Sequence, residues 1–202
     1  MAETYVPSVE EFQCSVRTEF GFLIENFGYQ ETRIDVVKYF NPCSVRYQSR
    51  AAIVVVSGIG HGYNTSVTLI DPVAEHREIE QGLPLWPVLA IRAPALLDEL
   101  YSTSGQLRQL PLLARGLLAN GTDILEGDFS IRERAMQLVE AAIEEQRDRE
   151  TANRLRDACF RANEEFRKAN YSRVVEILSE HENVLGKTDA RKLDYARSKL
   201  RQ

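Results

Sequence analysis

The stretch that decides the fold is Val45-Arg46-Tyr47-Gln48-Ser49-Arg50-Ala51-Ala52-Ile53-Val54-Val55-Val56. In its first half, apolar or small residues alternate with Arg46, Gln48 and Arg50, a two-residue period typical of a strand with one buried face. Its second half is rich in β-branched residues, as a buried strand requires. A second alternating run covers residues 65–70 and stops at Asp71-Pro72. With a further strand over residues 35–40, these runs predict a small antiparallel sheet joined by hairpins.

A helix is predicted ahead of this sheet, over residues 9–27. Ser8 and Glu11 have the spacing of a capping box, in which the hydroxyl and the carboxylate accept from backbone N–H groups at the helix start. Apolar residues then recur at spacings of four and three, on one helical face: Phe12, Val16, Phe20, Leu23 and Phe27. Gly28 suits the left-handed conformation that ends many helices. A helix packed on one sheet face is a common α+β arrangement.

Helical patterns dominate the second half of the chain. Prolines and a glycine over residues 82–94, around Trp86, predict an interrupted segment and a junction. After it, apolar spacing predicts helices over residues 95–101, 104–119, 171–178 and 188–200, and Pro111 should kink or split the second of them. A long helix should begin at the capping box formed by Ser130 and Glu133. Residues 144–151 contain no apolar side chain, which leaves either a helix that projects into water or a turn.

The predicted fold class is therefore α+β, with an N-terminal helix packed on a small antiparallel sheet, followed by an α-helical C-terminal half. The expected domains are an α+β domain over 1–94 and an α-helical domain over 95–202, which can also pack as one unit. A chain of 202 residues with 44% hydrophobic residues buries enough apolar surface to fold without a disulfide or a metal.

Cysteine usage and the N-terminus indicate the compartment. Cys14, Cys43 and Cys159 are an odd number at wide spacings with no C-x-x-C, which argues against a secreted disulfide framework and a cysteine-rich zinc site. The sequence has no signal-peptide pattern and no apolar run of bilayer length. We expect a cytoplasmic protein without a membrane partner.

The two halves of the sequence differ in charge. Residues 1–100 carry 7 basic and 13 acidic side chains, whereas residues 101–202 carry 18 basic and 17 acidic ones. An acidic surface repels phosphate groups and attracts basic proteins. We therefore expect another protein, a basic one, as the partner, and no nucleic acid.

No catalytic set, metal site or cofactor motif stands out. The glycine-rich segment 57–62 is followed by strand-like residues and not by the helix that a phosphate loop needs, so it predicts a hairpin connection. The three histidines, His61, His76 and His181, lack metal-site spacing. The carboxylates at positions 123, 126 and 128 form too short a set for a calcium loop and are interpreted as structural.

Two stretches resemble known families. Ala162, Phe166, Tyr171 and Val175 resemble a single tetratricopeptide-like helical hairpin, with an ordinary antiparallel helix pair as the alternative. The N-terminal third is similar to uncharacterised bacterial proteins that resemble immunity proteins of polymorphic toxin systems. The residues that carry this second resemblance are Phe22-Leu23-Ile24-Glu25-Asn26-Phe27-Gly28-Tyr29, Val45-Arg46-Tyr47-Gln48-Ser49 and the strand at 53–56. It implies a toxin-binding protein and supplies no catalytic residue.

Three functional hypotheses follow. The first, which we favour, is a non-enzymatic binding protein that acts by surface complementarity through its sheet face and hairpin tips. Its candidate binding residues are Arg46, Gln48, Arg50, His61 and Tyr63. The second is a metal-dependent or histidine-assisted hydrolase, with His61 beside Asp71 or Asp123. The third is a helical scaffold or adaptor that oligomerises through the second half.

Overall fold

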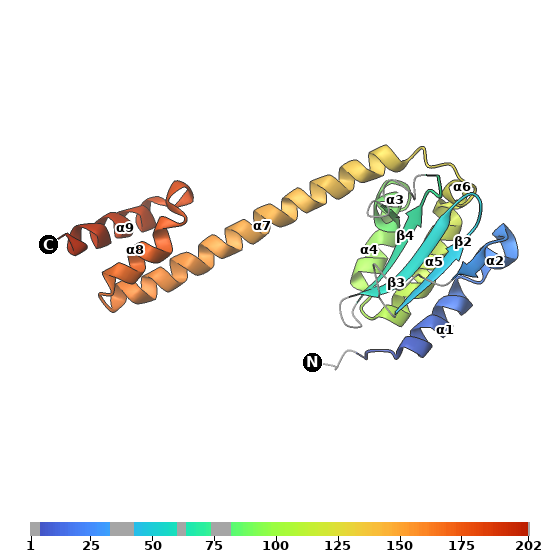
Figure 1. The fold of residues 1–202 in the computed structure, drawn as a ribbon, viewed down its shortest axis with the longest axis horizontal. Coiled ribbons are helices and arrows are strands. Elements are labelled where there is room, and N and C mark those ends of the chain that lie inside the picture. Colours follow the sequence, from blue (N-terminus) through green and yellow to red (C-terminus); the bar gives the residue numbers. More distant parts are fainter. Residues whose placement is uncertain (1–4, 33–42, 60–63, 74–81, 202) are drawn as a thin grey trace. The chain divides into compact units, whose positions relative to one another are not determined.

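A computed structural model of the chain describes residues 5–32, 43–59, 64–73 and 82–201 (Figure 1). The α+β fold class is confirmed: an N-terminal helix packs on an antiparallel sheet, and helices follow. The elements are α1 (Val9–Glu19), α2 (Phe22–Phe27), β1 (Gln30–Thr32), β2 (Ser44–Gln48), β3 (Ile53–Ile59), β4 (Asn64–Ile70), β5 (Leu83–Pro84), α3 (Leu85–Arg92), α4 (Pro94–Ser102), α5 (Gln106–Asn120), α6 (Thr122–Leu125), α7 (Arg132–Arg167), α8 (Tyr171–Ser179), a 3-10 turn (Glu182–Val184) and α9 (Lys187–Leu200).

These elements form two compact units, Met1–Val139 and Glu140–Gln202. Helices α4, α5 and α6 share a hydrophobic core with the sheet, although they follow the expected domain boundary at residue 94. Whether residues 1–94 and 95–202 fold as separate domains stays a prediction. Within the described ranges, no helix is both long and apolar enough to cross a lipid bilayer.

The sheet is a simple antiparallel meander in the order β1-β2-β3-β4-β5. One row of directly opposed residues crosses it from β2 to β5: Tyr47, Val54, Leu69 and Leu83, all fully buried. Since side chains alternate along a strand, Arg46 and Gln48 face the opposite side of the sheet. The strand predicted over residues 35–40 lies outside the described residues.

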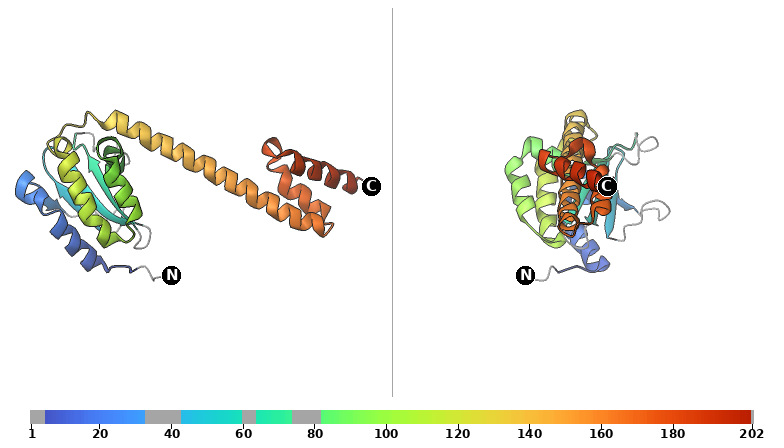
Figure 2. Two further views of the ribbon diagram at one scale, coloured as in Figure 1. Left: turned by 180° about the vertical axis from the view of Figure 1, so that it is seen from behind. Right: turned by 90° about the vertical axis from the view of Figure 1, so that its left-hand side faces the viewer.

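The helices of unit 1 cover the inner face of this sheet. Helix α1 packs on β2 and on α5, and α5 packs on β4. Figure 2 shows the green helices on one side of the cyan strands. The largest fully buried side chains of this two-layer core are Phe12, Phe20, Leu23, Tyr29, Tyr47, Leu69, Leu83, Leu85, Leu89, Leu110 and Leu117.

The single helix predicted over residues 9–27 is two helices, α1 and α2. The chain breaks at Gly21, a weak helix former, and the N–H of Leu23 bonds to the carbonyl of Phe20 at 3.0 Å. Phe20 and Leu23 are both fully buried on either side of this break. The change of direction therefore keeps both side chains in the core.

Residues 82–94 form no continuous helix, as predicted, because β5 and the break at Ala93 interrupt them, but the helix α3 over residues 85–92 was not predicted. Pro84 precedes this helix and Pro87 lies in its first turn, where a backbone N–H has no intrahelical acceptor to lose. Pro94 opens α4 in the same way. Pro111 lies inside α5, which is one helix from Gln106 to Asn120.

Two buried glutamines of α5 bond to the sheet, Gln109 at the edge of β4 and Gln106 at the end of β3. The Oε1 of Gln109 accepts from the backbone N–H of Thr65 at 2.7 Å, and its Nε2 donates to the carbonyl of Thr103 at 2.8 Å. Gln106 donates through Nε2 to the carbonyl of Ile59 at 3.1 Å. Because β5 pairs with β4 only at Thr68 and Leu69, Gln109 bonds to β4 where its strand partner stops.

Unit 2 is built from the end of α7 together with α8 and α9 (Figure 1). Its core consists of Ala158, Ala162, Val174, Ile177, Leu178, Leu193 and Ala196. The rings of Phe166 and Tyr171 meet edge to face, with centroids 5.8 Å apart. Ala169 has φ +57°, and the turn there is closed by a 2.9 Å bond from the N–H of Asn170 to the carbonyl of Glu165. This is the bond of a Schellman helix end, where glycine is the usual residue.

Residues 144–151, for which the sequence left helix and turn open, are helical within α7. All their side chains are exposed. Polar contacts along the helix surface join Glu145 to Arg149 and Gln146 to Glu150, both at a spacing of four residues. Such pairs support a helix that has no core to bury.

Candidate functional site

A surface hollow of about 910 Å³ lies at one end of the sheet in unit 1. Four segments far apart in sequence contribute to it: the end of α2, strand β1, the β2–β3 turn and α6. We call it the amide hollow, and its lining residues are Asn26, Phe27, Gly28, Gln30, Thr32, Gln48, Ser49, Arg50, Ala51, Leu125 and Glu126.

Buried polar contacts hold these segments together. The hydroxyl of Tyr29, which is 1% exposed, donates to the carbonyl of Leu125 at 2.9 Å and so ties the α2–β1 junction to α6. The hydroxyl of Ser49 accepts the N–H groups of Ala51 and Ala52 at 3.1 Å, which fixes the β2–β3 turn. The hollow therefore has walls that the core supports.

A glycine allows α6 to approach that turn. Gly127 has φ +99°, and a Cβ added there would lie 3.4 Å from the carbonyl oxygen of Ala51. A larger residue would be strained in this backbone conformation. Gly127 thus lets the loop after α6 pass directly beside the turn that carries Arg50.

Polar side chains that have no partner among the described residues converge on the hollow. Across the part of the chain that the structure describes, the side chains of Asn26, Gln30, Gln48 and Arg50 make no hydrogen bond or ion pair. Thr32 adds a buried hydroxyl oxygen, which likewise has no partner among the described residues. Three carboxamides supply both donors and acceptors, and the guanidinium supplies charged donors.

The opposite, inner side of β1 and β2 is closed by an ion pair and a buried tyrosine. Arg17 of α1 binds Glu31 at 2.8 Å, and this contact lowers the pKa of the Glu31 carboxyl. Tyr47 is fully buried beside them, and its hydroxyl has no partner among the described residues. Burial raises the pKa of Tyr47 to about 12. The Tyr47 hydroxyl on this side is buried, and the exposed ion pair already satisfies Arg17 and Glu31.

The structure brings together part of the predicted binding set. Gln48 and Arg50 line the amide hollow, and Arg46 lies on the same outer face of β2 without reaching it. His61 and Tyr63 lie outside the described residues. Sequence reasoning missed Asn26, Gln30 and Glu126, because they come from other segments and only the fold places them beside the β2–β3 turn.

A second cavity, of about 230 Å³, lies between the start of β4 and helices α3, α4 and α5. Ile59 and Asn64, which flank the segment containing His61 and Tyr63, both line it. Its walls are mainly apolar and include Pro84, Leu85, Trp86, Leu100, Tyr101 and Leu113. Its polar members include Asn64, Thr65, Ser66 and Gln109, and each of them makes a hydrogen bond within unit 1. This cavity therefore offers a ligand few polar groups that are not already used by the fold.

Unit 2 contains a third hollow, of about 750 Å³, where α7 meets the end of α8. It is lined by Arg154, Asp157, Phe160, Arg161, Glu180 and His181. Phe160 is 65% exposed. The mixed charges of this hollow do not point to one class of ligand.

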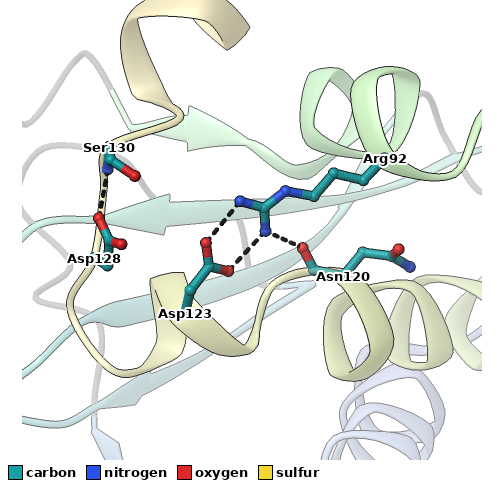
Figure 3. A network of polar contacts seen from close by, with 5 residues as sticks. All are labelled: Arg92, Asn120, Asp123, Asp128 and Ser130. Atoms are coloured by element: carbon teal, nitrogen blue, oxygen red, sulfur yellow. Dashed lines mark hydrogen bonds and ion pairs between the residues drawn. The ribbon is translucent and has the colours of Figure 1, made fainter.

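Asp123, a residue of the hydrolase hypothesis, belongs to a structural network (Figure 3). Arg92 of α3 donates to both of its carboxylate oxygens, at 2.7 and 2.6 Å, and to the carbonyl of Asn120 at the end of α5. The ion pair lowers the pKa of Asp123. Close by, the carboxylate of Asp128 accepts from the N–H of Ser130.

The other chemistry of the hydrolase hypothesis is not assembled in the described ranges. Asp71 accepts from the backbone N–H of Val73 at 2.9 Å, an ordinary turn contact. Within those ranges, no three histidine, cysteine, aspartate or glutamate side chains lie close enough to hold a metal ion.

Comparisons with known proteins return no match to a family model, to a curated protein or to a solved structure.

Proposed function

We propose that the chain is a non-enzymatic protein-binding protein that contacts its partner through the amide hollow and the adjoining outer face of β2. The observation that carries this proposal is the convergence of Asn26, Gln30, Gln48 and Arg50, whose side chains have no partner in the described part of the chain. A carboxamide pairs with both the N–H and the C=O of a peptide group, and arginine is enriched in protein interfaces.

The charge of the sequence supports a basic partner in the cytoplasm. Residues 1–100 carry six more acidic than basic side chains, which favours encounter with a positively charged protein over long distances. The resemblance of the N-terminal third to immunity proteins gives the finer proposal that this partner is a toxin. Co-expression with the neighbouring open reading frame tests that point: growth in the presence of its product supports a toxin partner, and unrelieved toxicity contradicts it.

Site-specific photo-crosslinking in the source cells tests the binding surface. A benzoylphenylalanine replaces Gln48 or Arg50, and a matched control replaces Leu118, an exposed residue of α5 that does not line the hollow. We expect one protein to crosslink from positions 48 and 50 and not from position 118. No adduct from the hollow, or the same adducts from all three positions, would contradict the proposal.

A further inference from the structure

The amide hollow carries two opposite charges that no described residue pairs. Arg50 stands on the β2–β3 turn, and Glu126 follows α6 in the segment that passes beside this turn. Both side chains are exposed, and neither forms an ion pair with the other or with another described residue. An occupant that fits therefore brings one negative and one positive group.

Neutral amides line the hollow together with these charges. Asn26 comes from α2, Gln30 from β1 and Gln48 from β2, and Gln30 lies directly opposite Gln48 in the sheet. Each amide offers one acceptor oxygen and two donor hydrogens. A polypeptide backbone presents the complementary groups at every residue, as an N–H and a C=O.

Other classes of ligand fit this lining less well. A nucleic-acid backbone brings only negative charge, which Glu126 repels. A neutral carbohydrate can bond to the amides through its hydroxyl groups but brings no charge to match those of Arg50 and Glu126. The volume of about 910 Å³ is near the top of the range of roughly 300–1,000 Å³ for ligand pockets, so there is room for several residues of chain.

We infer that the amide hollow binds an extended polypeptide segment that carries one acidic and one basic side chain. The acidic group pairs with Arg50, the basic group pairs with Glu126, and the carboxamides of Asn26, Gln30 and Gln48 bond to the backbone of the segment. This inference rests on the proposed function and names the chemistry of the partner at the same site.

Two capped peptides test the inference: acetyl-Glu-Ala-Ala-Ala-Lys-amide and its reverse, acetyl-Lys-Ala-Ala-Ala-Glu-amide. Each is titrated into the full ¹⁵N-labelled chain, and the side-chain NH₂ signals of Asn26, Gln30 and Gln48 are followed. We expect saturable shifts of these signals with one of the two orders. Replacing the glutamate or the lysine of that peptide with glutamine weakens binding about two- to fivefold, as expected for exposed ion pairs.

Variants of the chain show which charged side chain of the hollow pairs with which charged residue of the peptide. R50Q removes the preference for glutamate over glutamine in the peptide, and E126Q removes the preference for lysine over glutamine. R108Q, a change at an exposed arginine of α5 that does not line the hollow, serves as the matched control and keeps both preferences. All three changes are at exposed positions, and the backbone amide spectrum confirms that each variant is folded.

Several results would overturn the inference. Shifts located away from the hollow, equal affinity for the charged and the neutral peptides, or R50Q and E126Q that behave like R108Q each contradict it. Maltotriose that shifts the three NH₂ signals when neither peptide does would assign a carbohydrate site.

The peptide titration and the crosslinking experiment can succeed or fail independently of each other. If a protein crosslinks from position 48 while neither peptide binds, the protein partner stands and the segment chemistry is wrong. If a peptide binds as expected while no protein crosslinks from the hollow, the site takes peptides and the proposed protein partner is wrong.

Discussion

The hydroxyl of Tyr29 donates to the backbone carbonyl of Leu125 at 2.9 Å, a buried contact between residues 96 positions apart in the sequence. It joins the segment before β1 to α6. Leu125 lines the amide hollow, and Tyr29 lies between Gly28 and Gln30, which also line it. Tyr47 is equally buried on β2, but its hydroxyl has no partner among the described residues. The two tyrosines form a natural pair for measuring what one buried hydrogen bond contributes.

Phenylalanine at these two positions should change the stability of unit 1 differently. We expect Y29F to lower the free energy of unfolding by about 1–2 kcal/mol, because the carbonyl of Leu125 loses its donor. Y47F should be neutral or stabilising by up to about 1 kcal/mol, because it removes a buried polar group without a partner. Urea unfolding followed by fluorescence of Trp86, the single tryptophan, measures both changes in unit 1. Equal destabilisation by the two variants would contradict the difference in hydrogen bonding.

The contacts of Gln109 at the edge of β4 should be costly to remove. Q109L leaves the buried N–H of Thr65 and the part-buried carbonyl of Thr103 without this partner, so we expect a loss of about 1–3 kcal/mol in the free energy of unfolding. Q137L, at an exposed position of α7, is the control and should change stability by less than about 0.5 kcal/mol. Trp86 fluorescence in urea again gives the readout. A Q109L chain as stable as Q137L would show that these contacts contribute nothing.

The ion pair between Arg92 and Asp123 should make stability depend on pH. The pKa of Asp123 is lowered from its ordinary value of 3.8, so its contribution is present above that value and is lost as the pH falls through the lowered pKa. At pH 7 we expect D123N to be less stable by about 1 kcal/mol, a modest figure because both side chains are partly exposed.

Urea unfolding at a series of pH values checks this expectation. The difference between the unchanged chain and D123N should shrink as the solution becomes more acidic than pH 3.8. D98N, at an exposed carboxylate of α4 without an ion pair among the described residues, is the control and should stay close to the unchanged chain throughout. A D123N difference that stays constant with pH would contradict the role of the charge.

Ala169 offers a stabilising substitution in unit 2. Its φ of +57° is unfavourable for a residue with a Cβ, so we expect A169G to stabilise α8 and α9 by about 0.5–1 kcal/mol. A190G, inside α9, applies the same change where glycine weakens the helix and should destabilise it by about 1 kcal/mol. Hydrogen exchange of the amides in both helices provides the measurement. Faster exchange in A169G than in the unchanged chain would contradict the expectation.

Much of the sheet and most helices could be predicted from local patterns. Strands β2, β3 and β4 follow from alternation and β-branched composition, because their register buries one face. Strands β1 and β5 have three and two residues, and they exist only through pairing with their neighbours. No local pattern of that length specifies a strand.

The helix predictions were wrong or left open where the local sequence fits both a helix and a break. Pro87 normally signals a break, but in the first turn of α3 it removes no hydrogen bond. Over residues 144–151 the absence of apolar side chains left two alternatives, since a helix stabilised by its own ion pairs has no hydrophobic period to detect.

The candidate site was predicted only where it coincides with a strand. Gln48 and Arg50 were found because the alternation of β2 places them away from the core and at a turn. Asn26 lies near the end of α2 and Glu126 directly follows α6. The local sequence around them shows only a helix end and a loop. Their proximity to Arg50 results from the packing of α6 beside the β2–β3 turn, which no spacing along the chain encodes.

Gln109 has a consequence for the behaviour of the chain in a crowded cell. A strand edge with open N–H and C=O groups is a template for pairing with other molecules, and repeated pairing leads to aggregates. By accepting from the N–H of Thr65 through the side chain of Gln109, α5 occupies part of this edge without adding another strand. We therefore expect this amide to lower the tendency of unit 1 to pair edge to edge with other chains.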